Sequence, residues 1–121
     1  MGTFAISLKD NGEYKYTYNN KRGKTLVTSI AYQTKEDCYT NIDLLKNEIG
    51  NLSFSKYKTT AGKFYFKISL NETVFCISRK FTTILRIEKA ILDIQKYILE
   101  SEILDFTHYS FPEINFEDEE D

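Results

Sequence analysis

The sequence predicts an α+β fold in which a single antiparallel sheet carries two helices packed on one face. Three observations lead to this prediction. One residue pattern occurs twice, about fifty positions apart. Each copy contains short runs in which apolar and polar residues alternate, which is typical of strands. Each copy ends in a longer segment with apolar residues every three or four positions, which is typical of an amphipathic helix.

The duplication is clearest around two glycines. Residues 12–18 read GEYKYTY and residues 62–68 read GKFYFKI, with glycine at the expected turn and matching apolar positions. Further along, the offset is 49, and two helical stripes correspond: Cys38, Ile42, Leu45 and Ile49 with Ile87, Ile91, Ile94 and Ile98. We therefore predict one domain at residues 1–100, made of two repeats, 1–50 and 51–100.

Three strands precede the helix in the first repeat. We expect them near residues 4–8, 14–18 and 25–30, because apolar and polar residues alternate there and turn residues separate the runs. Thr34 is the expected N-cap of the helix, and its hydroxyl would accept a hydrogen bond from a free amide of the first turn. Gly50 is the expected stop.

The second repeat has the same predicted order. Strands are expected near residues 54–60, 63–69 and 73–78, followed by a helix near residues 83–100. Strands joined by short turns are antiparallel, and one apolar face per strand places both helices on the same side of the sheet.

Several short segments of the first repeat also occur in a known family. They are FAIS at residues 4–7, NGEYKY at 11–16, Thr28-Ser29, YQTK at 32–35, and Ile42. With the duplication, they make residues 3–100 similar to the YegP-like family, which consists of small bacterial and archaeal proteins of uncharacterised function. The resemblance implies a β-β-β-α(-β) unit, two of which share one sheet and exchange their C-terminal strands, here residues 54–58 and 105–111. It implies no enzymatic activity.

The C-terminal end differs from the rest of the chain in charge. The chain has 16 Lys and Arg and 18 Asp and Glu, but residues 101–121 contain eight of the acids and no basic residue. We predict a C-terminal extension at 101–121. Residues 102–116 are apolar enough to dock partly on the body, whereas the acidic end, 117–121, is expected to be disordered.

The second predicted helix has an additional apolar stripe. Leu85, Leu92 and Leu99 stand where the first helix has Glu36, Asp43 and Gly50. Burying a leucine is worth about 1.5–3 kcal/mol, so we expect something to cover the stripe. One cover is intramolecular, by Phe106, Tyr109, Phe111 and Phe116 of the extension. The other is a homodimer or an unknown protein partner, which would make the three leucines with Phe106, Tyr109 and Phe111 an interaction surface.

The face of the sheet turned away from the helices is a second candidate surface. The alternation places Lys15, Thr17, Tyr65 and Lys67 on it. Lysines and an aromatic ring on an open sheet could bind a single-stranded nucleic acid weakly. We do not favour this alternative, because the acidic extension would compete with phosphate.

Residues typical of catalysis are missing from the sequence. No motif for a nucleophile, a phosphate loop, a dinucleotide or a metal is present, and the one histidine, His108, has no partner in the sequence. Cys38 and Cys76 stand alone, and we predict that both are buried. The prediction is a non-catalytic binding or protein-interaction module without cofactor. A cytoplasmic location is expected, because the sequence has no signal peptide and no membrane span.

Overall fold

Seven strands and two α-helices make up the part of the chain that the computed structural model describes, residues 2–111 without the side chains of 109–111. The elements are β1 (Thr3–Lys9), β2 (Tyr14–Asn19), β3 (Thr25–Ser29), α1 (Lys35–Asn47), the 3-10 helix η1 (Ile49–Asn51), β4 (Ser53–Lys58), β5 (Phe64–Leu70), β6 (Thr73–Ser78), α2 (Ile84–Tyr97), the 3-10 helix η2 (Ile98–Glu100) and β7 (Glu102–Phe111). The strand and helix segments predicted for residues 1–100 are all present, with bounds that differ by a few residues.

The strands form one mixed sheet in the order β4-β5-β6-β3-β2-β1-β7. Neighbouring strands are antiparallel, except that β7 pairs with β1 in parallel. The prediction of an antiparallel sheet is therefore wrong. The reason is that no hairpin turn joins β7 to β1: β7 follows α2 and pairs with the first strand of the other half, so no short turn makes the two strands antiparallel.

The two halves of the chain repeat several local contacts. The Thr34 hydroxyl caps α1 by accepting a hydrogen bond from the amide of Asp37 at 3.1 Å, and the Thr83 hydroxyl caps α2 by accepting one from the amide of Arg86 at 3.2 Å. The predicted N-cap at Thr34 is confirmed. Ser29 Oγ accepts from the amide of Tyr16, and Ser78 Oγ accepts from the amide of Phe66, both at 2.9 Å.

Both helices pack on the same face of the sheet. The pairing register places Phe4, Tyr18 and Val27 of the first half on the same face as Cys76 and Ile68 of the second. Helix α1 contacts β1 and β2, and α2 contacts β5. The apolar side chains of both halves form a single buried cluster, and the other face of the sheet has no helix on it in the described part.

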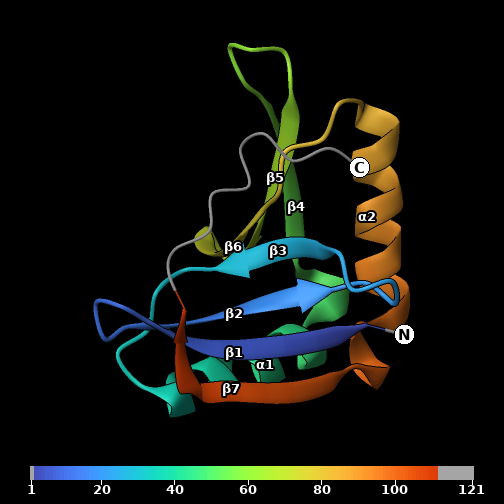
Figure 1. Cartoon of the computed structure of the whole chain (residues 1–121). Coiled ribbons are helices and arrows are strands. Elements are labelled where there is room, and N and C mark those ends of the chain that lie inside the picture. The colour runs from blue at the N-terminus through green and yellow to red at the C-terminus, as the bar shows by residue number, and fades with distance from the viewer. Residues whose placement is uncertain (1, 112–121) are drawn as a thin grey trace.

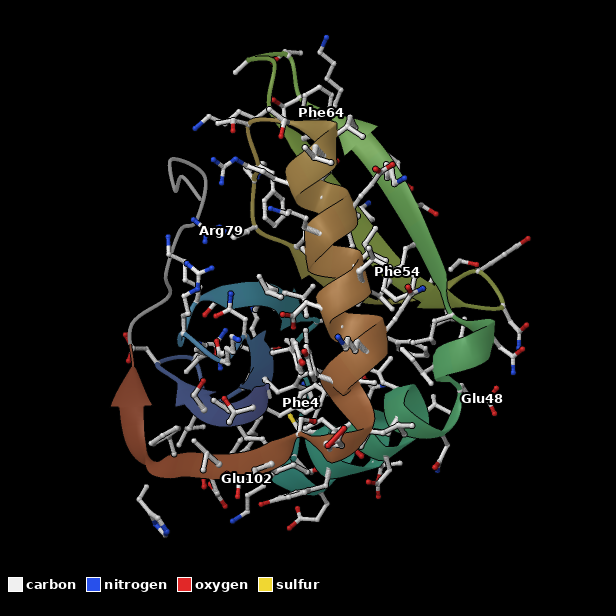
Figure 2. The ribbon with its side chains drawn as sticks, turned by 90° about the vertical axis from the view of Figure 1, so that its right-hand side faces the viewer. Phe4, Glu48, Phe54, Phe64, Arg79 and Glu102 are labelled. Atoms are coloured by element: carbon white, nitrogen blue, oxygen red, sulfur yellow. The ribbon has the colours of Figure 1, made fainter. Side chains whose placement is uncertain are left out.

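The sheet is strongly curved. In Figure 1, strands β1, β2, β3 and β7 run across the view with α1 behind them, whereas β4 and β5 run upward beside α2. Figure 2 shows α2 in front of the sheet, with one side turned to the viewer. Neither α1 nor α2 is long and apolar enough to cross a membrane.

Candidate functional site

The outer side of α2 carries the predicted apolar stripe, Leu85, Leu92 and Leu99, which we call the leucine stripe. The side of α2 that faces the sheet is occupied by buried residues: Ile87, Ala90, Ile91 and Ile94. The leucine stripe lies nearly opposite to them on the helix, and its residues are 66%, 63% and 63% exposed. The stripe begins in the first turn of α2 and ends in η2.

The predicted intramolecular cover of the leucine stripe is wrong for Phe106. This residue lies in β7, which pairs with β1, and its own side chain is 39% exposed. The side chains of Tyr109 and Phe111 and all of Phe116 lie outside the described residues. Residues 102–111 dock on the body as a strand, because their backbone extends the sheet at β1 and Asp105 forms an ion pair at 3.2 Å with Lys35 of α1.

Charged residues of both signs flank the leucine stripe. Glu88 lies between Leu85 and Leu92, and its carboxylate is 3.5 Å from the ammonium of Lys56 on β4. Lys96 lies between Leu92 and Leu99, on the other flank. A shallow depression of about 580 Å³ follows this side of the helix and is lined by Lys89, Leu92, Asp93, Gln95, Lys96 and Tyr97.

The open face of the sheet holds the second candidate surface. The rings of Tyr57 and Tyr65 stack with their centroids 5.2 Å apart. The ammonium of Lys67 lies 5.1 Å from the centroid of Tyr57, and that of Lys80 lies 5.5 Å from the centroid of Tyr65. The sequence had indicated Tyr65 and Lys67. It missed Tyr57 and Lys80, although alternation along the predicted strand at 54–60 could have found Tyr57.

Lys15 and Thr17 lie on the same open face but not beside this cluster. Thr17 pairs with Thr28, Thr28 with Ile77, and Ile77 with Lys67. Three strand spacings, about 14 Å, therefore separate Thr17 from Lys67. Four of the predicted residues share a face, and only Tyr65 and Lys67 belong to the aromatic and basic cluster.

Polar groups in the interior contact one another across the two halves of the chain. Tyr16 donates a hydrogen bond to Asn41 Oδ1 on α1, and its hydroxyl is 3.3 Å from Cys76 Sγ on β6. Burial raises the pKa of the Cys76 thiol to about 12, and burial with the nearby Asp37 raises that of Cys38 to about 12. Both thiols are therefore protonated at neutral pH, and their predicted burial is confirmed.

His108 is exposed on β7. Among residues 2–111 with described side chains, no group of three or more His, Cys, Asp or Glu residues is placed to hold a metal ion. The strongest features outside the core are thus two surfaces, the leucine stripe and the open face of the sheet.

The fold is that of a small class of solved proteins of unknown function. The chain is similar to the protein of unknown function YegP from E. coli, with a TM-score of 0.76 and 20% identity over 89% of this chain and 95% of that one. It is also similar to a UPF0339 protein from Shewanella oneidensis, with a TM-score of 0.79 and 18% identity over 88% and 92%. No family model and no curated protein matches the sequence. The resemblance to the YegP-like family is confirmed at the level of the fold.

Proposed function

We propose that the protein is a non-catalytic interaction module that binds a protein partner through the leucine stripe. The observation that carries this proposal is the exposure of about two-thirds of each of Leu85, Leu92 and Leu99. Single exposed leucines are ordinary on protein surfaces, but these three recur every seven residues and line up along one side of α2. Anchors spaced by whole helical turns are the usual contact points of helix-mediated recognition.

The comparison of α1 with α2 supports the same proposal. The corresponding residues of α1 are Glu36, Asp43 and Gly50, so the fold does not need leucine at these places. Covering the exposed part of one leucine is worth about 1–2 kcal/mol, as a share of the 1.5–3 kcal/mol for complete burial. A strip of three is therefore enough to drive weak association and costly to leave in water.

We infer that the two halves descend from one duplicated unit. The shared order of strands and helix, the two threonine caps and the Ser29 and Ser78 hydrogen bonds support this inference. The placement of β7 beside β1 of the other half fits an exchange of C-terminal strands. The leucine stripe is then a feature that only one of the two copies has.

A non-catalytic role is supported by the chemistry of the described side chains. The two thiols are buried and protonated at neutral pH, and the exposed His108 has no acid or metal ligand in a described cluster with it. The depression beside α2 is lined by side chains of one helix, whereas a typical active site gathers groups from several elements.

The test is affinity capture with a tagged copy of the whole chain, using purified untagged protein and cell extract as separate prey. Leu92→Asp gives α2 the kind of residue that α1 has, and Thr40→Asp, at an exposed position of α1, is the matched control. The wild type and the control should capture the same prey, and Leu92→Asp should capture at least 10-fold less. Equal capture by all three proteins would contradict the proposal.

A second candidate function rests on the stacked rings of Tyr57 and Tyr65 with the ammonium groups of Lys67 and Lys80 beside them. Bases of a single-stranded nucleic acid can stack on such rings, and lysines can neutralise the phosphates. Binding of an oligonucleotide should then fall steeply with salt, strengthen on removal of residues 112–121, and weaken at least 10-fold in Tyr57→Ala. Salt-independent binding would contradict this candidate.

A further inference from the structure

Strand β4 has the same place in the second half of the chain as β1 has in the first. The pairs between β4 and β5 match those between β1 and β2 one for one at an offset of 50 residues: Phe4 pairs with Tyr18, for example, and Phe54 with Ile68. Strand β1 has a second neighbour on its outer side, the parallel strand β7. In the described part of the chain, the equivalent side of β4 is an open edge of the sheet.

Three residues of β4 turn their backbone groups toward this open edge. The amide of Thr59 donates to the carbonyl of Lys63 across the turn, and every second residue of an antiparallel strand faces the same neighbour. Phe54, Lys56 and Lys58 therefore turn their N–H and C=O groups away from β5, to the side where no strand follows among the described residues. Such an edge can accept one more strand.

The charges at this edge indicate what kind of strand fits. Strand β4 carries Lys56 and Lys58, both exposed, and no acid. Glu88 of α2 lies 3.5 Å from the ammonium of Lys56, so β4 brings two lysines against this one acid. A strand with a carboxylate beside the lysines is therefore favoured over a basic one.

Strand β7 shows how a strand lies on the equivalent edge. Ile103 lies opposite Phe4 and is partly buried against the core. Asp105 lies opposite Ile6, and its carboxylate is 3.2 Å from the ammonium of Lys35 at the start of α1. Strand β7 thus brings one apolar and one acidic side chain to the side of the sheet that carries the helices.

The same register on β4 meets side chains that suit it. An apolar residue would lie opposite Phe54, which is partly buried against the core and would be covered further. An acidic residue would lie opposite Lys56, the equivalent of Ile6. Ile84 stands where α1 has Lys35, and it is 38% exposed, so it offers a second apolar contact beside the added strand.

We propose that the outer edge of β4 binds an extended segment of another protein. The segment pairs parallel to β4, as β7 pairs with β1, and carries an apolar residue opposite Phe54 and an acidic residue opposite Lys56. This site goes beyond the proposed function, because it uses the backbone of β4 and not the leucine stripe. A second copy fits poorly, since two β4 edges side by side would bring their lysines together. Residues 112–121 follow β7, which is at the opposite edge of the sheet.

Peptide titration of the full chain, followed by NMR of the backbone amides, tests the site. The probe is a capped peptide with the sequence of residues 101–106, SEILDF. The amides of Phe54, Lys56 and Lys58 should shift and exchange more slowly with solvent, with a dissociation constant of about 0.1–1 mM. The same peptide with lysine in place of both acids should bind at least about 5-fold more weakly in low salt. Shifts confined to β1 and β7, or equal binding of the two peptides, would overturn the proposal.

A proline at the edge gives a second arm. Lys56→Pro removes an amide that points away from β5, which an edge strand tolerates, and Lys56→Ala is the matched control that loses the same charge but keeps the amide. The alanine variant should still bind the acidic peptide, more weakly than the wild type, and the proline variant should not bind it. Circular dichroism and Tm check that both variants fold, and the two peptides on the wild type test the site without any variant. Equal binding by the two variants would overturn the proposal.

Other occupants of the edge would give different results. Slow exchange of the β4 amides without peptide that is lost on removal of residues 112–121 would identify that segment as the occupant and overturn the proposal. Slow exchange that grows with protein concentration would identify a second copy and overturn it as well. Neither result bears on the proposed function, which the capture by Leu92→Asp measures separately.

Discussion

The buried hydroxyl of Tyr16 offers a test of how the two halves are held together. It donates to Asn41 on α1 and contacts the sulfur of Cys76 on β6, so it joins a strand, a helix and the other half of the sheet. Tyr16→Phe removes this donor and leaves the amide oxygen of Asn41 buried without it. An unsatisfied buried acceptor costs about 1–3 kcal/mol.

The second half of the chain packs in the same way without this hydrogen bond. At the corresponding positions it has Phe66 and Ala90, and Phe66 stacks on Phe81 at 6.4 Å as Tyr16 stacks on Tyr32 at 6.4 Å. The double variant Tyr16→Phe with Asn41→Ala should therefore lose less stability than the sum of the two single variants. For residues in contact, we expect a coupling of about 0.5–3 kcal/mol.

Thermal and urea unfolding of the wild type, the two single variants and the double variant measures this coupling. A loss of 1 kcal/mol lowers Tm by about 3–6 °C in a chain of this size. Tyr32→Phe is the control, because among the described residues the buried Tyr32 hydroxyl has no hydrogen-bond partner, and its removal should be nearly neutral. Equal losses in Tyr16→Phe and Tyr32→Phe, or strict additivity in the double variant, would refute the reasoning.

Three further predictions concern pH and capping. Hydrogen bonds from Thr107 lower the pKa of Asp105 to about 2. The ionised carboxylate therefore contributes fully to folding stability above its unfolded pKa of 3.8, and this contribution is lost as the pH falls toward 2. Asp105→Asn should flatten this part of the Tm profile, and an unchanged profile would contradict the prediction. Burial raises the pKa of Cys38 and Cys76 to about 12, so the folded state holds two thiol protons that the unfolded state releases above pH 9. The free energy of unfolding should therefore fall between pH 9 and 12. A thiol reagent should react with the two cysteines only after unfolding. Thr83→Ala removes the cap of α2 and should cost about 1 kcal/mol in urea unfolding, whereas no loss would argue against the cap.

Local patterns in the sequence were enough to predict most of the elements. Alternation around the turns at Gly12 and Gly62 located the hairpins, and both glycines have a positive φ that other residues rarely adopt. The spacing of apolar residues located both helices, and the threonine at position 34 marked the start of the first one. These signals are short-range, so one sequence suffices to detect them.

The parts that the sequence did not predict depend on contacts between distant segments. The parallel direction of β7 follows from where the chain goes after α2, which periodicity does not encode. Lys80 joins the cluster on the open face from a position beyond β6, where no strand alternation assigns a side. The leucine stripe was found because the two halves could be compared position by position, but the sequence did not determine whether the C-terminal extension or a partner buries it.

The central claim is that the leucine stripe of α2 is a surface that binds a protein partner. Affinity capture by the tagged full chain tests it most directly, with purified untagged protein and cell extract as separate prey and with the wild type beside Leu92→Asp and Thr40→Asp. The account predicts that the wild type and Thr40→Asp capture the same prey and that Leu92→Asp captures at least 10-fold less. Equal capture by the wild type and Leu92→Asp would contradict it.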